Sequence, residues 1–519
     1  MSGYDAVIIG ADANGLAAAA KLAIAGRRVL VLERSDGVGG LSRTLEFYPG
    51  FKANVYHDGG EWIAPRLLAV LTQGGLQRVE RDVPVASIAV SDADVAWPIY
   101  YDARRTEAAL EKMLPRDSSR WRAFMAHTAH VTGFLERLYR TPPPRLRGSR
   151  GESWRLMQAV WWLRRSGRRA AMQVVRAIPM PIADIVGEWF EAKAVQGPLC
   201  VFGIECVLQG PLSAGTGLVF FHRHVGARSI GDRSRWLGGS SAVAEAFRRV
   251  AEQRQTVLRF DASVERIAVR DGRVCGVVAN GEEIPCQVVL SALDPKRTFS
   301  LVEQEWLDPR FLQSVLTYRY RGATARLHYA LDTAPRFGSR AAWPEEWLGG
   351  SIVMAESPLA LERAYDAAKY GELPDRPALT MTIPSVYDSS LAPPGKHVLS
   401  VSVHHVPYSL RGGWSARAKD ALAARVEQRL EELAPGLTSR VLGRLVLSPA
   451  DIAERAEATE GSLTHGELAL DQWLFARPLF ECARYATPVQ GLWLAGMSTH
   501  PANGSGMSGW LAATEVLSA

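Results

Sequence analysis

The 519-residue sequence has little cysteine and little lysine. Its five cysteines, at positions 200, 206, 275, 286 and 482, form no Cys-x-x-Cys pair. We therefore expect no dithiol chemistry, no zinc site and a reducing compartment. Positive charge comes almost entirely from arginine, with 52 residues against 8 lysines. The net charge of +6 is modest for this length and does not indicate nucleic-acid binding.

Long hydrophobic runs are also lacking. No stretch of about twenty apolar residues is free of charge, proline or clustered glycine, so we expect no membrane-spanning helix. The first five residues lead directly into a predicted strand, which indicates no secretory signal and a cytoplasmic protein. Hydrophobic and charged contents of 47% and 22% are ordinary for a globular chain long enough for two or three domains.

The N-terminal segment predicts a dinucleotide-binding unit. Residues 6–9 are an apolar run typical of a buried strand, and a helix-prone segment and a second strand follow. Gly10 permits the sharp turn between strand and helix, and Gly15 lets the helix pack closely on the sheet. Glu33, at the end of the second strand, can accept hydrogen bonds from ribose hydroxyls. The pattern predicts an α/β, Rossmann-like unit whose helix N-terminus receives a diphosphate.

Asp12 stands at the position of the middle glycine in the G-x-G-x-x-G pattern. Its carboxylate would meet the phosphates where they normally approach the backbone. At roughly 4 Å and an effective dielectric of ~20, each like-charge pair would cost up to about 4 kcal/mol before relaxation. The cost is smaller if Asp12 turns outward or caps the helix, as aspartate often does.

Two further glycine-rich segments are placed where a cofactor could pass. Gly39-Gly40 is followed three residues later by Arg43, which would supply a fixed cation for a phosphate. Near the C-terminus, residues 491–496 predict a strand, residues 497–509 a glycine-rich turn and residues from 510 onward a helix. This second helix could direct its N-terminus at the ribityl-phosphate half of a cofactor.

Together these elements resemble the flavoprotein oxidoreductases of the phytoene desaturase and carotenoid isomerase superfamily. Within it, the chain is most similar to the group named for pyridine nucleotide-disulphide oxidoreductase domain-containing protein 2. The resemblance covers nearly the whole chain, including residues 210–216, 292–299, 391–398, 464–472 and 499–501. It implies a discontinuous Rossmann-like FAD-binding domain of the glutathione reductase type, combined with an α+β substrate domain.

The resemblance also implies non-covalent FAD and assigns its contacts. The adenosine diphosphate part would be held by Gly10, Asn14, Gly15, Glu33, Gly40 and Arg43. Further candidate cofactor residues are Asp12, Ala13, Arg34, Leu41, Ser42 and Val264, with Gly496, Met497 and His500 near the flavin. The chain departs from the family pattern at Asp12 and at residues 502–505, where a run of glycines is usual. These departures favour an alternative, a degenerate scaffold or binding protein without FAD.

The predicted elements divide the chain into five segments. Residues 1–65, 229–292 and 489–519 would form the cofactor domain, and residues 66–228 and 293–488 the substrate domain. Residues 66–228 read mostly as helices and loops. Residues 263–289 alternate with a period of two and turn at Asp271-Gly272 and Asn280-Gly281, which predicts a β-meander.

Residues 139–176 form a basic segment with ten arginines, one glutamate and three tryptophans. It could bind a membrane surface peripherally, with arginines on lipid phosphates and tryptophans at the interface. The alternative is a lid helix that buries its tryptophans against the substrate domain. Nucleic-acid binding is not expected, because no recognition module surrounds the segment.

No motif fixes a catalytic base. His465 and Glu467 are candidates, because both titrate and alternation by two would place them on one face of an extended segment. The alternative is a hydrogen-bonded pair that braces a domain interface. His57 could line the cavity, although an exposed position in a turn is expected. No metal site is expected, and His404-His405 is predicted to be a strand position rather than a ligand pair.

These observations predict an FAD-dependent oxidoreductase that acts on a lipophilic or conjugated small molecule. The reaction would be a desaturation, an oxidation or a redox-neutral isomerisation, in which flavin accepts a hydride and the protein orients the substrate. The alternative function is the flavin-free scaffold. The sequence indicates neither an oligomeric state nor whether NAD(P) takes part.

Overall fold

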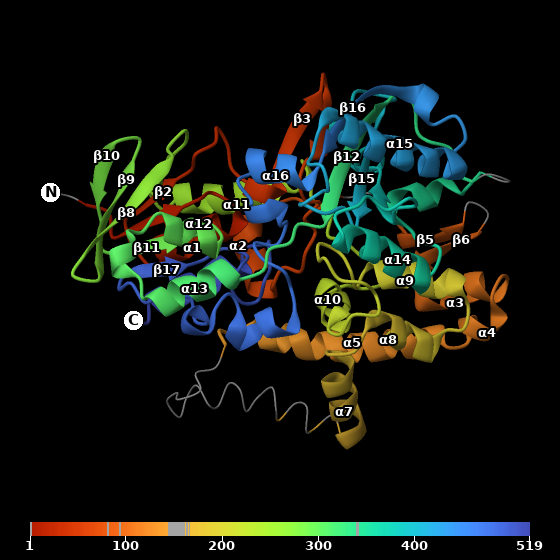
Figure 1. The fold of residues 1–519 in the computed structure, drawn as a ribbon, viewed down its shortest axis with the longest axis horizontal. Coiled ribbons are helices and arrows are strands. Elements are labelled where there is room, and N and C mark those ends of the chain that lie inside the picture. The colour runs from red at the N-terminus through yellow and green to blue at the C-terminus, as the bar shows by residue number, and fades with distance from the viewer. Residues whose placement is uncertain are drawn as a thin grey trace.

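The computed structural model describes residues 3–79, 83–92, 95–143, 161, 165, 167–338 and 342–519. Figure 1 shows two β-sheet layers side by side. The sheet nearer to both chain ends carries the predicted dinucleotide unit. The larger sheet lies at the opposite end, with a group of helices beneath it.

The first layer is a five-stranded parallel sheet. In spatial order its strands are β17 (Leu492–Leu494), β11 (Val289–Ser291), β1 (Ala6–Ile9), β2 (Val29–Leu32) and β7 (Val257–Arg259). Strands β1, β2 and β11 are short, buried and apolar except for Ser291, as expected for a sheet covered on both faces. The strands come from separate parts of the chain, so the predicted discontinuous Rossmann-like fold is confirmed.

Helices cover both faces of this sheet. They are α1 (Ala13–Ile24), α2 (Pro65–Gln73), α11 (Ser241–Glu252), α12 (Pro295–Ser300), α13 (Pro309–Thr317) and α17 (Met507–Val516). Helix α17 packs directly on α1, and a Cβ at Gly509 would lie 1.8 Å from the backbone oxygen of Asn14. Glycine is therefore required at this crossing. The terminal helix begins at Met507, three residues before its predicted start.

The predicted β-meander is confirmed as a separate three-stranded sheet. Its strands are β8 (Val264–Arg270), β9 (Arg273–Ala279) and β10 (Glu282–Pro285). Both turns have left-handed backbone at their two central residues, with φ of 52° and 71° at Asp271-Gly272 and 49° and 76° at Asn280-Gly281. These are the residue types that tolerate such φ values in tight hairpins.

The larger sheet has seven strands. In spatial order they are β16 (Val441–Leu447), β12 (Thr324–Leu331), β15 (His397–His404), β14 (Leu379–Thr382), β13 (Ser351–Met354), β5 (Val85–Asp92) and β6 (Val95–Tyr100). All neighbours are antiparallel except β13 and β5. His404 ends β15, as predicted, whereas His405 follows the strand with a φ of +57°. Strands β5 and β6 fall within a segment expected to be mostly helices and loops, and Pro98 of β6 is tolerated because that strand forms the sheet edge.

The remaining elements complete the helical layer and the connections. The helices are α3 (Ala103–Glu111), α4 (Pro115–Ser118), α5 (Trp121–Tyr139), α7 (Arg168–Ala177), α8 (Ile182–Trp189), α9 (Lys193–Val201), α10 (Thr216–Arg223), α14 (Pro358–Lys369), α15 (Ala416–Leu433) and α16 (Pro449–Arg455). A hairpin of β3 (Thr44–Tyr48) and β4 (Phe51–Asn54) joins the layers, because β4 contacts β15 and β3 contacts β16. The exact domain boundaries stay predictions.

The predicted basic segment is only partly visible. Residues 144–160, 162–164 and 166, which include Trp154 and Trp162, lie outside the described residues. The described helix α7 projects from the helical layer (Figure 1). Within the described part of the chain, no helix combines the length and hydropathy that crossing a bilayer requires.

Candidate cofactor-binding site

A groove opens where strands β1, β2 and β11 end. This is the edge at which open α/β sheets bind their ligands. Including its solvent-open part, the groove has an empty volume of about 920 Å³. Among its lining residues are the predicted Gly10, Asp12, Glu33, Arg34, Gly40, Leu41, Arg43, Val264 and His465.

A smaller cavity continues the groove toward the C-terminal loop. The two cavities share Asp12, Leu41 and His465. Further residues of the smaller cavity include the predicted Ala13, Ser42 and Met497, together with His57 and Gly504. The shared residues show that the two cavities adjoin beside Asp12, the N-cap of α1.

Two glycines shape the turn between β1 and α1. Gly10 has a φ of +96°, which favours glycine. A Cβ at Gly15 would lie 2.1 Å from the Gly10 carbonyl oxygen and 3.2 Å from the Ala292 side chain. Both positions therefore need glycine, for the reasons that the motif predicts.

The Asp12 side chain caps α1. Its Oδ1 accepts a hydrogen bond of 2.7 Å from the Gly15 N–H, so the carboxylate occupies the helix N-terminus. Burial raises the pKa of Asp12 to about 7, with a smaller upward contribution from Glu33. Of the two arrangements considered for Asp12, the structure contains the cap.

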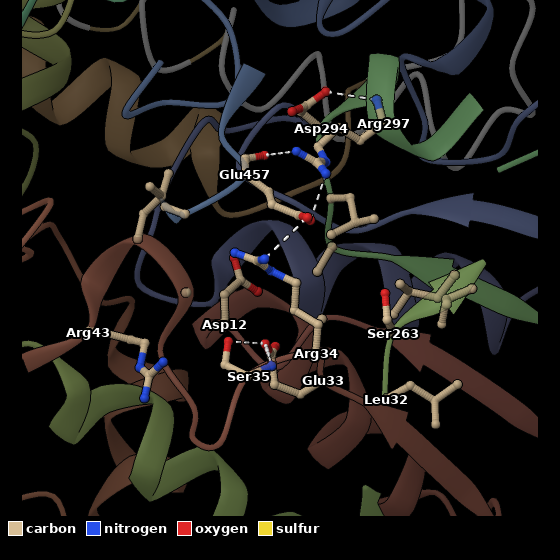
Figure 2. A pocket seen from close by; sticks show the side chains of 18 of the residues that line it. Asp12, Leu32, Glu33, Arg34, Ser35, Arg43, Ser263, Asp294, Arg297 and Glu457 are labelled. Atoms are coloured by element: carbon tan, nitrogen blue, oxygen red, sulfur yellow. Dashed lines mark hydrogen bonds and ion pairs between the residues drawn. The ribbon is translucent and has the colours of Figure 1, made fainter. Parts of the chain in front are cut away.

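The Glu33 carboxylate is buried and joins the loops that follow β1 and β2. Its Oε2 accepts a 2.7 Å hydrogen bond from the Ala11 N–H. Its Oε1 accepts hydrogen bonds from the Ser35 N–H at 2.9 Å and the Ser35 hydroxyl at 2.7 Å (Figure 2). Carboxylate oxygens have about two acceptor sites each, so Glu33 keeps some capacity for a ribose hydroxyl.

Arginines from separate segments line the groove. Figure 2 shows the Glu457 carboxylate between Arg34, at 3.2 Å, and Arg297, at 2.6 Å. The Arg34 guanidinium also donates to the Arg455 carbonyl at 2.7 Å, and Arg297 donates to the Glu457 carbonyl at 2.7 Å. We call this set of contacts the Glu457 bridge. It connects the loop after β2 and helix α12 to the segment after α16.

Four predicted cofactor residues lie behind the site rather than in its lining. Gly15 supports the first turn, as described above. The Asn14 amide donates to the Asn503 carbonyl at 2.9 Å and accepts from the Gly509 N–H at 3.2 Å, which ties α1 to the C-terminal loop. A Cβ at Gly496 would lie 2.4 Å from the Ala292 oxygen, so this glycine permits close packing beside β11.

His500 is the fourth of these residues. Its ring is buried edge-on against Tyr139, with centroids 5.6 Å apart, and its Nε2 lies 3.3 Å from the Leu138 carbonyl oxygen. Burial lowers the pKa of His500 to about 4. The ring therefore anchors the C-terminal loop to α5.

The expected extended segment at His465 and Glu467 is wrong. His465 has a φ of +50° and Gly466 a φ of +119°, so the two side chains diverge. His465 lines both cavities, and its Nδ1 is buried without a hydrogen-bond partner. Burial lowers the pKa of His465, which favours the neutral ring.

Glu467 is fully buried away from the groove. Its carboxylate pairs with Arg321 and Arg319, and it accepts a 2.9 Å hydrogen bond from the Leu208 N–H. Burial raises the pKa of Glu467, and Arg321 opposes that shift. These contacts favour the bracing role over the catalytic one, although the pair with His465 does not form.

The expected exposure of His57 is wrong. The side chain is buried, its Nδ1 accepts a 3.0 Å hydrogen bond from the Gly59 N–H, and burial together with Arg223 lowers its pKa to about 3. The neighbouring Asp58 forms a two-pronged ion pair with Arg326 of β12. This contact with the larger sheet holds the turn inward.

In the C-terminal loop, side-chain hydrogen bonds fix the structure where a run of glycines is usual. The Asn503 amide donates to the Trp62 carbonyl at 2.9 Å, and its Oδ1 accepts from the Ser505 N–H at 2.8 Å. The Gly504 N–H donates to the buried Glu61 carboxylate. Gly504 itself still lines the smaller cavity.

The donors, acceptors and space of the groove fit a dinucleotide cofactor. Gly10 and Gly40 leave room where the chain passes Asp12, and a Cβ at Gly40 would lie 2.9 Å from the Asp12 Cβ. Glu33 supplies the hydroxyl acceptor and Arg43 a cation. The Asp12 carboxylate opposes an anion at the helix N-terminus, and Asp294 and Glu457 add negative charge to the lining of the groove. Within the described ranges, no three His, Cys, Asp or Glu side chains are grouped to hold a metal.

Sequence comparison places the chain among flavoproteins. The family model for flavin containing amine oxidoreductases matches residues 14–177 and 209–517. The rat pyridine nucleotide-disulfide oxidoreductase domain-containing protein 2 is 29% identical over 96% of this chain and 91% of its own length. A neurosporene-forming phytoene desaturase from Rhodobacter capsulatus is 25% identical over 96% of this chain and 90% of its own length.

Solved structures give the same fold. Cyclohexylamine oxidase from Brevibacterium oxydans superposes with a TM-score of 0.61 and 13% identity, covering 99% of this chain and 98% of the oxidase. At this identity the likeness concerns the fold alone. None of the comparisons favours the alternative of a flavin-free scaffold.

Proposed function

Because this chain belongs to the family of flavin containing amine oxidoreductases, and is thus a flavin-dependent oxidoreductase, we propose that its cofactor is FAD bound along the groove. The observation that supports this placement is the groove at the carboxyl ends of β1 and β2, with Glu33 at its floor. The adenosine diphosphate half would lie there, and the flavin half would extend toward Met497 and Gly504 in the smaller cavity.

The visible spectrum of the purified protein tests this proposal. Bound flavin gives bands near ~370 and ~450 nm. We expect these bands in the purified protein or after reconstitution with FAD. Replacing Glu33 with Gln should weaken FAD retention relative to Glu372→Gln, a matched change in an exposed ion pair far from the groove. A protein without flavin bands after reconstitution would contradict the proposal.

The bound flavin would supply hydride acceptance. The protein's own residues supply the rest of the site. The Glu33 carboxylate would hold a ribose hydroxyl, the Arg43 guanidinium would supply a cation for the phosphates, and neutral His465 lines both cavities. His465 is the better of the two candidate bases, because its Nδ1 has no protein partner whereas the Glu467 carboxylate is held by two arginines.

Comparison of two variants separates these roles. We expect His465→Gln to lower the rate of flavin reduction with little effect on thermal stability. Glu467→Gln should instead lower the melting temperature, because it removes the charge of a fully buried carboxylate that pairs with Arg321 and Arg319. Equal rates of flavin reduction in His465→Gln and the parent protein would remove His465 from the mechanism.

For the substrate, we propose a lipophilic or conjugated molecule, as in phytoene desaturases. The named activity of the Rhodobacter relative supports this choice. Anaerobic mixing with a detergent-dispersed polyene tests it. We expect either loss of the ~450 nm band or an isomerised product that chromatography detects. Bleaching by putrescine or cyclohexylamine but not by polyenes would point to an amine oxidase instead.

Helix α7 supports a peripheral membrane contact. Met172 and Val175 lie one turn apart and are 60% and 59% exposed, and the exposed Arg168 and Arg169 precede them. This combination suits an anionic lipid surface. We expect binding to phosphatidylglycerol vesicles and weaker binding of Met172→Glu. Leu359→Glu, at an exposed position of α14, is the control. Equal sedimentation of both variants would contradict the contact.

A further inference from the structure

The first turn of α1 already holds an anion of the protein itself. The Gly15 N–H, which a cofactor phosphate could use, donates to the Asp12 carboxylate at 2.7 Å. The neighbouring Ala11 N–H donates to the Glu33 carboxylate at 2.7 Å. The Gly15 and Ala11 N–H groups are therefore both satisfied by carboxylates. A diphosphate in the groove would therefore lie near the Asp12 carboxylate, which lines both cavities.

No cation compensates Asp12 directly. Among the described residues, no lysine, arginine or histidine forms an ion pair with Asp12 within 4.0 Å, and two arginines of the groove pair with other carboxylates: Arg43 with Asp36, and Arg34 with Glu457. The other titratable groups that face the Asp12 cavities are Glu33 from β2, Tyr56 and His57 after β4, Asp294 and Arg297 after β11, Arg455 and Glu457 after α16, and His465.

The carboxylate of Glu33 already raises the pKa of Asp12. Burial is the main cause that raises the pKa of Asp12 to about 7, and Glu33 adds to it. A phosphate would add further negative charge and favour the protonated form still more. Protonation also changes the chemistry of the side chain, since a carboxyl group has one O–H donor. Oδ1 can remain the acceptor of the helix cap while Oδ2–H donates to a phosphate oxygen.

We propose that Asp12 takes up one proton when FAD binds, and that its carboxyl group then serves as a hydrogen-bond donor to the diphosphate. This inference rests on the proposed function, because it assumes FAD in the groove. The proton comes from solvent, and no covalent bond changes. The residue that replaces the usual glycine thereby becomes part of the cofactor site and makes cofactor affinity dependent on pH.

The dependence of the FAD dissociation constant on pH tests the proposal. Apo-protein is titrated with FAD between pH 6 and 9 and binding is followed by flavin fluorescence. Below about pH 7 Asp12 is already protonated, so the dissociation constant should be level. Above it, uptake of one proton should weaken binding by about tenfold per pH unit. Asp12→Asn, which keeps the cap and the neutral donor, should bind with little pH dependence.

A matched control variant shows whether the pH dependence belongs to Asp12 rather than to any capping aspartate. Asp308 caps α13 in the same way, with Oδ1 accepting from the Arg310 N–H at 2.8 Å, and it is exposed outside the groove. Asp308→Asn should retain the parent pH dependence. Calorimetry at pH 8 in two buffers of different ionisation heat provides a separate measurement. It should give uptake of close to one proton for the parent protein and close to none for Asp12→Asn.

The outcomes distinguish the two proposals. A parent dissociation constant that does not change with pH, or a pH dependence that persists in Asp12→Asn, would overturn the role of Asp12 and leave the FAD site in place. Failure of both proteins to bind FAD at every pH would instead overturn the proposed cofactor. If Asp12→Asn does not fold, as judged by circular dichroism, the proton count of the parent protein decides.

Discussion

Asp12 serves the helix and opposes the cofactor at the same time. As the N-cap of α1 it stabilises the first turn, yet glycine at this position loses only a few tenths of a kcal/mol of capping energy. Removal of the carboxylate should gain more free energy of FAD binding than the cap loses. At pH 8 the parent protein must take up a proton to bind FAD, so we expect Asp12→Gly to lower the FAD dissociation constant by up to about tenfold, which corresponds to about 1.4 kcal/mol.

Fluorescence titration of the two proteins measures this change. The melting temperature of the apo-protein should stay nearly constant, and Asp308→Gly serves as the capping control. Unchanged or weaker affinity in Asp12→Gly would show that the carboxylate does not oppose FAD.

Glu205 is a second residue whose charge depends on its partners. It lies between Arg233 and Arg223, and its side chain is 6% exposed. Burial alone would raise the pKa of Glu205, but the two guanidinium groups lower it to about 2. The stabilisation is therefore present above the ordinary pKa of 4.5 and is lost as the pH falls toward 2.

We expect Glu205→Gln to destabilise the fold at pH 7 by about 3–5 kcal/mol, the usual cost of breaking a buried ion pair. Thermal unfolding at pH 7, 4 and 3 measures it, and the difference from the parent protein should shrink as the pH falls. Glu372→Gln, in an ion pair whose side chains are 72% and 55% exposed, should change stability little. Equal effects of both variants on stability would show that the ion pairs of Glu205 do not stabilise the fold.

At the scale of elements, the crossing of α17 over α1 depends on Gly509, which has no side chain. Gly509→Ala would place a methyl group 1.8 Å from a backbone oxygen, and backbone cannot yield as a side chain can. We expect a clear fall in melting temperature and weaker FAD retention, because Asn14 links this crossing to the C-terminal loop. Gly187→Ala in α8, where nothing lies within 4 Å, should be neutral or slightly stabilising.

Local sequence patterns predict some elements and miss others for a physical reason. The β1–α1–β2 unit and the meander follow from short-range signals, namely an apolar run, an obligatory glycine and two turn dipeptides. Strand β5 reads Val85-Ala-Ser-Ile-Ala-Val, an apolar run that periodicity alone does not assign to strand or helix. Its partner β13 lies far away in the sequence, so only the folded sheet identifies it.

Some features of the candidate site could also be predicted from the sequence, and others could not. Gly10, Glu33 and Arg43 lie in loops whose strand endings can be read from sequence, and the groove brings them together. The Glu457 bridge could not be predicted from the sequence, because its side chains come from three distant segments. The divergence of His465 and Glu467 also could not be read, because it depends on a left-handed residue that is not glycine.

At the scale of the whole molecule, the Glu457 bridge connects the cofactor layer to the segment that follows the larger sheet. The three side chains are about one-third exposed, so the pairs contribute modestly, about 1 kcal/mol together. We expect Glu457→Gln to accelerate FAD dissociation about fivefold, because the groove opens more often. Stopped-flow release measures it, with Glu372→Gln as control. Equal release rates would show that the bridge does not retain the cofactor.

The contact of α1 with α17 joins segments separated by almost the full length of the chain, as in the bond between Asn14 and Asn503, 489 positions apart. During translation, the apolar faces of β1 and α1 therefore cannot be fully buried until the last helix has left the ribosome. We expect stalled chains that lack residues 489–519 to be cut by protease within α1, whereas released chains resist. Protection of α1 in the stalled chains would show that the N-terminal half matures on its own.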